Sequence, residues 1–207
     1  MISGSKVLWI VGSSIIHWAA VEAGKRNGGK QLGFKTEKLE IHWVGKQGLK
    51  FQTLDNFIDQ KRGILPTPDY ILIHCGANDL THTDITGKGL SENIKCSLLR
   101  YKALFRNMTL IWSSMLQRRY WHHAPLNTGS LIDQKRKRVN LAIKSFIKDN
   151  GGKVISHDHN IKAKELSLYR YDGTHLSDLG NQVFLNNIQG GLEVFLGSAQ
   201  TEFPFSV

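Results

Sequence analysis

The sequence contains few cysteines and no long apolar segment. Its 207 residues include only Cys75 and Cys96, each within or beside an apolar stretch. Two cysteines do not make the disulfide framework of a small secreted domain, so reduced, buried thiols and an intracellular, cytoplasmic location are expected. The longest apolar runs have the length of a strand, which excludes a transmembrane helix, and the first of them is too short for a signal peptide.

Acidic residues are outnumbered by basic ones. There are 17 Asp and Glu against 27 Lys and Arg, a formal net charge of +10 at pH 7. Such a surface attracts polyanions, so contact with RNA or anionic lipid is one interpretation, and an ordinary basic surface is the other. The run KRKR at 135–138 resembles a nucleic-acid patch, but its place at the start of an amphipathic helix favours a solvated helix face.

Several familiar motifs are also absent. Without G-x-G-x-x-G or a Walker lysine, a nucleotide-binding protein is disfavoured. Ile16 stands where the last glycine of a G-x-S-x-G elbow would be, which argues against the α/β-hydrolase fold. His122 and His123 are adjacent and no cysteine or histidine cluster supports them, so no metal or other cofactor is predicted. With no repeat or linker, 1–207 is predicted as a single domain with an ordered core of about 5–196 and a short C-terminal tail.

Short apolar runs alternate with helical patterns along the chain. The predicted strands are 6–11, 39–44, 69–74, 108–113 and 153–156. The predicted helices are 15–25, 51–62, 90–105, 130–149 and 177–195. This alternation predicts a three-layer α/β/α fold with a five-stranded parallel sheet in the flavodoxin-like order 2-1-3-4-5, whose binding site lies beyond the carboxyl ends of the strands.

Four polar clusters follow predicted strands: GSS at 12–14, GKQG at 45–48, GAND at 76–79 and DGTH at 172–175. All four therefore fall at the end of the sheet where this fold builds its sites. Each cluster also has an ordinary explanation as a helix cap or a turn. Their joint occurrence on these loops favours a functional site.

The residue types in these clusters suit acyl transfer. A serine hydroxyl needs a base, and His175 is available to deprotonate Ser14 while Asp172 orients the imidazole. The N–H of Ser14, at a helix N-terminus, together with the N–H of Gly48 and the side-chain amide of Asn78, would form an oxyanion hole.

The same clusters resemble a known family. GSSI at 12–15, the loop around Gly48, GAND at 76–79 and DGTH at 172–175 are similar to the four signature blocks of SGNH (GDSL-like) hydrolases. They extend from the first predicted strand to the last predicted helix. One position departs from the pattern, because Ser13 replaces the aspartate of the usual Gly-Asp-Ser; this puts the loop geometry in question rather than the nucleophile.

The resemblance implies both an activity and its residues. It assigns the nucleophile to Ser14, the oxyanion donors to Gly48 and Asn78, and the acid and base to Asp172 and His175. Members hydrolyse carboxylic esters, often of acetyl or other short acyl groups, without metal or cofactor. A small-molecule or lipid ester is therefore the expected substrate.

A narrower resemblance concerns three segments, VLWIVGSSIIHWA, KRKRVNLAI and DGTHLSDLGN. They are similar to SGNH domains encoded by vertebrate retrotransposons, which accompany proteins that handle element RNA. The alternative function is thus an SGNH-like RNA- or lipid-binding module with little or no catalysis.

A basic and aromatic loop follows the fourth predicted strand. Arg118, Arg119, Tyr120 and Trp121 are predicted to lie at the rim of the site, where arginines beside aromatics suit an anionic or planar group. A solvated loop with one packed tryptophan is the alternative.

Overall fold

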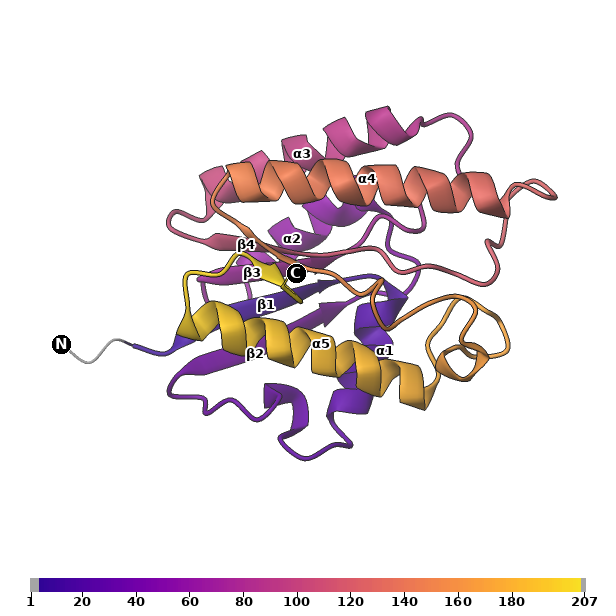
Figure 1. The fold of residues 1–207 in the computed structure, drawn as a ribbon. Helices are drawn as coiled ribbons and strands as arrows, with labels where there is room; N and C mark the ends of the chain where they lie inside the picture. Colours follow the sequence, from indigo (N-terminus) through magenta and orange to yellow (C-terminus); the bar gives the residue numbers. More distant parts are fainter. Residues whose placement is uncertain (1–3, 206–207) are drawn as a thin grey trace.

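A parallel sheet with helices on both faces forms the computed structural model, which describes residues 4–205 (Figure 1). Residues 1–3 and 206–207 of the predicted domain lie outside the described residues. The elements are β1 Lys6–Gly12, α1 Ser14–Ala23, β2 Leu39–Gly45, α2 Leu54–Arg62, β3 Tyr70–His74, α3 Gly87–Leu104, β4 Thr109–Ser113, α4 Gly129–Asp149, β5 Lys153–Ile155, α5 Asp178–Gly197 and β6 Glu202–Phe203. Single 3-10 turns cover Gly29–Gln31, Phe51–Thr53 and Leu166–Leu168.

The sheet has the predicted order with one strand added. The strands lie in the order β2-β1-β3-β4-β5-β6, and every neighbouring pair is parallel. The three-layer fold and the order of the first five strands are confirmed. The prediction of five strands is wrong by one, because β6 lies in the segment predicted as a tail. Two residues are too few to show an alternating pattern, so only their pairing with β5 identifies them as a strand.

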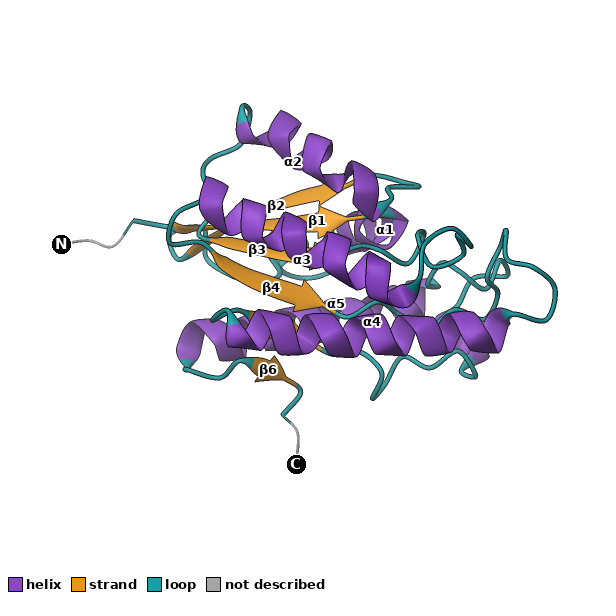
Figure 2. Cartoon of the chain, turned by 90° about the horizontal axis from the view of Figure 1, so that it is seen from above, coloured by secondary structure: helices purple, strands orange, loops and turns teal. Residues whose placement is uncertain are grey.

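The two faces of the sheet bury two separate apolar clusters. Side chains alternate along a strand, so Leu8 and Ile10 of β1 join the cluster under α1 and α5. Trp9 and Val11 join the cluster under α2, α3 and α4. Figure 2 shows α2, α3 and α4 on the near side of the sheet and α1 and α5 behind it. Burial on both faces explains why the strands read as continuous apolar runs.

Helix α3 differs from its prediction in two respects. It begins at Gly87 rather than at 90, because the Thr86 hydroxyl accepts a hydrogen bond from the Gly89 N–H and caps the helix despite the two glycines. Cys75 is buried as expected, whereas Cys96 is exposed. The inward positions of this part of α3 are Ile94 and Leu98, and Cys96 lies between them on the opposite side.

The basic run 135–138 is only partly a solvated face. Arg136 is fully buried, where it donates to the Met115 carbonyl at 2.8 Å and to Asp133 at 2.7 Å. Lys135 donates to three carbonyls of the loop 80–85. The predicted solvated face is therefore wrong for these two residues, which the 3.6-residue period alone could not reveal.

No helix within residues 4–205 is both long and apolar enough to cross a membrane.

Close backbone contact fixes the start of α5. The Ser177 hydroxyl accepts from the Gly180 N–H and donates to the Ser167 carbonyl, while the Ser177 N–H donates to the Leu168 carbonyl. A Cβ atom on Gly180 would lie 2.0 Å from that Leu168 oxygen. The turn Leu166–Leu168 and α5 thus hold the intervening loop from both sides.

Substituting Gly180→Ala is expected to lower the free energy of unfolding by about 1–3 kcal/mol, because the added methyl group overlaps backbone that cannot rotate away. Helix propensity alone would favour alanine by about 1 kcal/mol, so any net loss reports this overlap. Urea unfolding provides the measurement. Gly63→Ala is the matched control, since Gly63 has no atom within 4 Å of the new Cβ and a φ of −83°. Equal stability of both variants would contradict the expectation.

Candidate active site

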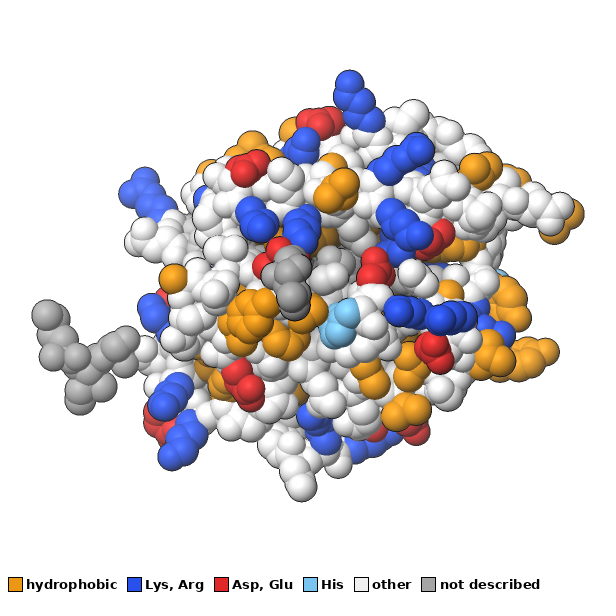
Figure 3. Space-filling view, viewed as in Figure 1, with side chains coloured by type: hydrophobic (Ala, Val, Ile, Leu, Met, Phe, Trp, Pro, Cys, Tyr) orange, Lys and Arg blue, Asp and Glu red, His pale blue; other side chains and the backbone are white. Residues whose placement is uncertain are grey.

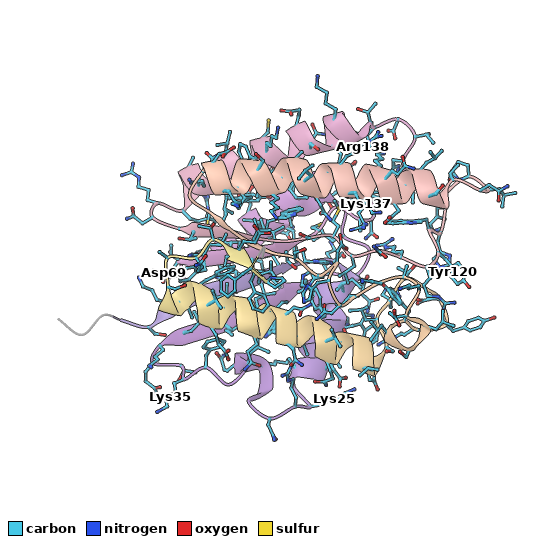
Figure 4. All side chains as sticks on the ribbon, in the orientation of Figure 1. Lys25, Lys35, Asp69, Tyr120, Lys137 and Arg138 are labelled. Atoms are coloured by element: carbon cyan, nitrogen blue, oxygen red, sulfur yellow. The ribbon has the colours of Figure 1, made fainter. Side chains whose placement is uncertain are left out.

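The polar clusters meet because the strands that precede them end at one level. Gly12 at the end of β1 is in register with Gly45 of β2 and with His74 of β3. The loops after these strands therefore start side by side. They lie at the end of the molecule where Figure 4 places Tyr120, opposite to Asp69.

Ser14, His175 and Asp172 form a continuous hydrogen-bonded chain. Ser14 is the first residue of α1, and its Oγ lies 3.0 Å from Nε2 of His175. Nδ1 of His175 lies 2.7 Å from Oδ2 of Asp172. A carboxylate can only accept, so Nδ1 carries the proton and Nε2 is free to accept the one from Ser14. This is the arrangement that a serine nucleophile requires.

The Asp172 carboxylate is held in its charged form. Its other oxygen, Oδ1, accepts from the backbone N–H groups of Thr174 at 2.8 Å and His175 at 2.9 Å. Although burial raises the pKa of Asp172, these bonds and the one from the His175 ring outweigh it and lower the pKa to about 2. At neutral pH a fixed negative charge therefore faces His175.

Gly48 and Gly45 have different structural roles. A Cβ on Gly45 would lie 2.5 Å from the His17 nitrogen, so this glycine allows α1 to pack against β2. Gly48 has open space around it and a φ of +69°, which glycine adopts without strain. Together with Ser14 and Asn78 it lines one cavity. The Ser14 N–H is also available, because the first amides of a helix have no helical acceptor.

The orientation of the Asn78 amide is determined by its partners. Its Oδ1 accepts from Nη2 of Arg118 at 2.8 Å, and its Nδ2 donates to the Leu49 carbonyl at 3.0 Å. Arginine can only donate and a carbonyl can only accept, so the amide has one orientation. One hydrogen of Nδ2 is left for another acceptor. The neighbouring Asp79 instead accepts from the Phe51 N–H, a structural role, and burial raises its pKa.

The four predicted rim residues have distinct positions. Arg118 lines the cavity with Ser14, and Trp121 is buried beneath it, 5.1 Å from its guanidinium. Arg119 and Tyr120 instead support the loop that carries Asp172 and His175, because both donate through their backbone N–H groups to the Gly173 carbonyl.

The cavity at Ser14 has a volume of about 610 Å³. Besides the residues named above, its lining includes the following side chains, none of which the sequence motifs indicated as contacts of Ser14: Gln47, Lys50, Thr81, His82, His122, His123 and Thr174. His122 donates from Nε2 to the Asp172 carbonyl at 2.8 Å. Within residues 4–205 no group of three His, Cys, Asp or Glu is arranged to hold a metal ion.

A much smaller pocket of about 10 Å³ shares Arg118 and Thr174 with the cavity at Ser14. It is lined by Ser13 and Ile15, which flank Ser14, and by Thr174, which precedes His175. Met115 and Leu116 provide apolar walls. This volume is about that of one water-sized probe, so it fits a group no larger than a methyl.

A buried polar chain lies under the site, and sequence reasoning missed it. Ser113 Oγ lies 3.0 Å from Nδ1 of His74 and 2.8 Å from Nε2 of His157. Asn187 donates to Nδ1 of His157 at 3.1 Å. Burial lowers the pKa of His74 to about 3 and lowers that of His157 well below its usual value. His74 ends an apolar run and His157 lies in a loop. They are connected only through Ser113 of β4, so the sequence shows no pattern that relates them.

Structural comparison extends these observations. The fold is similar to that of a lipolytic protein of the G-D-S-L family from Veillonella parvula, with a TM-score of 0.68 at 14% identity over 92% of this chain and 98% of that one. It is also similar to a GDSL-like lipase from Bacteroides thetaiotaomicron, with a TM-score of 0.67 at 19% identity over 91% of this chain and 88% of that one. An acetylxylan esterase from Geobacillus stearothermophilus has a similar fold, with a TM-score of 0.65 at 11% identity over 93% of this chain and 96% of that one. The chain therefore has the α/β fold of SGNH hydrolases.

No protein-family model matches the sequence, and no curated protein matches it significantly.

The buried histidines predict an acid-labile fold. Both are neutral when folded but titrate near pH 6.5 when unfolded, so the unfolded chain binds more protons below that pH. Stability is thus complete above about pH 6.5 and is lost as the pH falls towards about 3, by up to about 1.4 kcal/mol per pH unit for each histidine. Urea unfolding between about pH 7 and pH 4 should show this slope, and His74→Gln should reduce it. An unchanged slope in the variant would contradict this origin.

Proposed function

We propose that this protein is a serine esterase of the SGNH type, which hydrolyses carboxylic esters through an acyl-enzyme intermediate. The observation that carries the proposal is the hydrogen-bonded chain from Ser14 through His175 to Asp172 at the carboxyl ends of the strands. The likeness to GDSL-type lipases and esterases supports ester hydrolysis as the reaction class.

The proposed mechanism uses the geometry of each group. Ser14 Oγ attacks the ester carbonyl while its proton passes to Nε2 of His175, and Asp172 stabilises the imidazolium. The N–H groups of Ser14 and Gly48 and the free hydrogen of Asn78 Nδ2 stabilise the oxyanion. His175 then protonates the leaving alcohol. A water molecule, deprotonated by the same histidine, releases the acid from Ser14.

The small pocket supports short acyl groups as the preferred substrates. It is lined by both sequence neighbours of Ser14 and has room for about a methyl group, which is the size of an acetyl side chain. A longer chain would have to displace Met115 or Leu116, both buried. The similarity to an acetylxylan esterase agrees with this preference.

The alternative of an RNA- or lipid-binding module depends on the sequence alone. Its basis is the net charge of +10 and the similarity of three segments to retrotransposon-encoded domains. On the face drawn in Figure 3, Lys and Arg are spread among Asp and Glu rather than gathered in one patch. Lys135 and Arg136 are also occupied by internal contacts. We therefore propose the esterase as the main function.

Hydrolysis of p-nitrophenyl esters from acetyl to long acyl groups tests the proposal. Wild-type protein should hydrolyse the acetyl ester fastest, because longer chains exceed the small pocket. Ser14→Ala should lower kcat by about 10⁴-fold or more, since the nucleophile is lost. Ser145→Ala is the control, because Ser145 is exposed on α4. Wild-type protein inert on every ester, or Ser14→Ala at full rate, would exclude this mechanism.

Asn78→Asp tests the oxyanion donor separately. The carboxylate keeps the shape of the side chain and its acceptor for Arg118, but loses both amide hydrogens and brings negative charge to the oxyanion. We expect kcat to fall by about 10²–10³-fold. A matching loss of stability in urea unfolding would instead indicate a structural role, so both quantities are measured.

A further inference from the structure

The part of the chain that the structure describes lines the cavity at Ser14 with cationic groups and no carboxylate. Among the residues that the structure describes, its charged lining consists of Lys50 and Arg118, and His82, His122 and His123 add imidazoles beyond the one of the triad. Such a lining with one sign of charge concentrates anions inside a cleft.

The carboxylates of Asp172 and Asp79 are occupied by other partners. Asp172 accepts from the His175 ring and from two backbone N–H groups, and Asp79 accepts from the Phe51 N–H. Neither lines the cavity. A group that enters it therefore meets hydrogen-bond donors of Lys50 and Arg118 but no competing negative oxygen.

Arg118 is a partly used guanidinium. Of its five N–H donors, one bonds Asn78, and no carboxylate of the described chain lies within ion-pair distance of it. Its plane lies over Trp121, which fixes the side chain without neutralising it. Burial lowers the pKa of Arg118 to about 10 although Asp172 attracts the cation, so the group stays charged at neutral pH. A planar guanidinium group with free N–H donors suits binding of a carboxylate, sulfate or phosphate.

Lys50 supplies a second cation. Its side chain is partly buried on the loop after Gly48, and no ion pair or hydrogen bond occupies its ammonium group within residues 4–205. Lys50 and Arg118 thus line the same cavity from loops that follow different strands, β2 and β4.

The two pockets separate the parts of an ester. The pocket of about 10 Å³ fits an acetyl methyl, and the cavity of about 610 Å³ is left for the alcohol. Arg118 lines both pockets.

From this arrangement we infer that the preferred substrates are short-chain esters of anionic alcohols, whose carboxylate, sulfate or phosphate binds Arg118 and Lys50. The inference rests on the proposed esterase function and adds the substrate class. The anion is bound before and after acyl transfer and takes no part in bond making.

Two esters of matched shape, 3-acetoxybenzoate and its methyl ester, test the inference. The enzymatic rate for each ester is divided by its rate of hydroxide-catalysed hydrolysis. We expect kcat/KM to be about 10- to 100-fold higher for the anion, as charge-assisted hydrogen bonds imply. High salt should reduce only the anionic rate. Equal normalised rates with active enzyme would overturn the subsite and leave the esterase function standing.

Variants identify the residues responsible. Lys50→Gln and Arg118→Gln should each lower the ratio of the anionic to the neutral rate towards one. The ratio is measured because Arg118 also bonds Asn78, so its substitution changes both rates. Lys35→Gln is the matched control, since it removes one exposed lysine at the end of the molecule far from Tyr120 (Figure 4) and should keep the ratio. An unchanged ratio in both cavity variants would overturn the assignment.

Two further measurements separate the remaining outcomes. Calorimetric titration of Ser14→Ala with the same pair reads the subsite without turnover, and about tenfold tighter binding of the anion is expected. Equal binding would overturn the inference even if no ester is hydrolysed. The mono-p-nitrophenyl ester of succinate, compared with p-nitrophenyl butyrate, places the charge on the acyl side. Preference for the succinate ester over 3-acetoxybenzoate would reject the assignment of the anion to the alcohol.

Discussion

The register of three parallel strands is the constraint on which the site depends. β1 pairs with β2 on one side and β3 on the other, and Gly12 is level with both Gly45 and His74. Side chains at two of these three positions would clash: a Cβ at Gly12 would lie 2.3 Å from the His74 carbonyl, and one at Gly45 would meet α1. Glycine at both positions lets α1 begin directly after β1. Ser14 is thereby brought to the first turn of the helix, between the loops that carry Gly48 and Asn78.

The separation along the sequence between interacting residues determines how much of this structure could be predicted. The strands and helices could be predicted, because burial on both faces leaves a continuous apolar run in a strand and burial on one face leaves a 3.6-residue period in a helix. The clustering of Ser14, Asn78 and His175 followed from parallel topology alone. β6 has two residues and depends on an edge contact with β5, so no local pattern announces it. Arg136 looked like part of a charged surface, because its partners at Met115 and Asp158 are distant in sequence.

The lining of the cavity marks the other limit of prediction. Lys50 and His122 come from loops whose course depends on packing, and neither belongs to a recognised motif. Arg118 was expected at the rim, yet its contact with Asn78 depends on the fold of two loops forty residues apart. In the proposed mechanism that single bond connects binding with catalysis, because the proposed anion-binding group also orients the amide proposed as an oxyanion donor. The proposed mechanism therefore couples substrate recognition and reaction rate through the Arg118 side chain.

The contact between Gly173 and Tyr120 has an evolutionary consequence. Gly173 has a φ of +63°, and a Cβ there would lie 2.3 Å from the Tyr120 ring. The same two segments are joined by the hydrogen bond from the Thr174 hydroxyl to the Tyr120 carbonyl. A side chain at 173 therefore requires the ring at 120 to shift or be lost and also adopts a strained φ, whereas the backbone hydrogen bonds that join the two segments do not depend on that ring. Substitutions at these two positions should therefore be coupled, with a smaller side chain at 120 accompanying any side chain at 173.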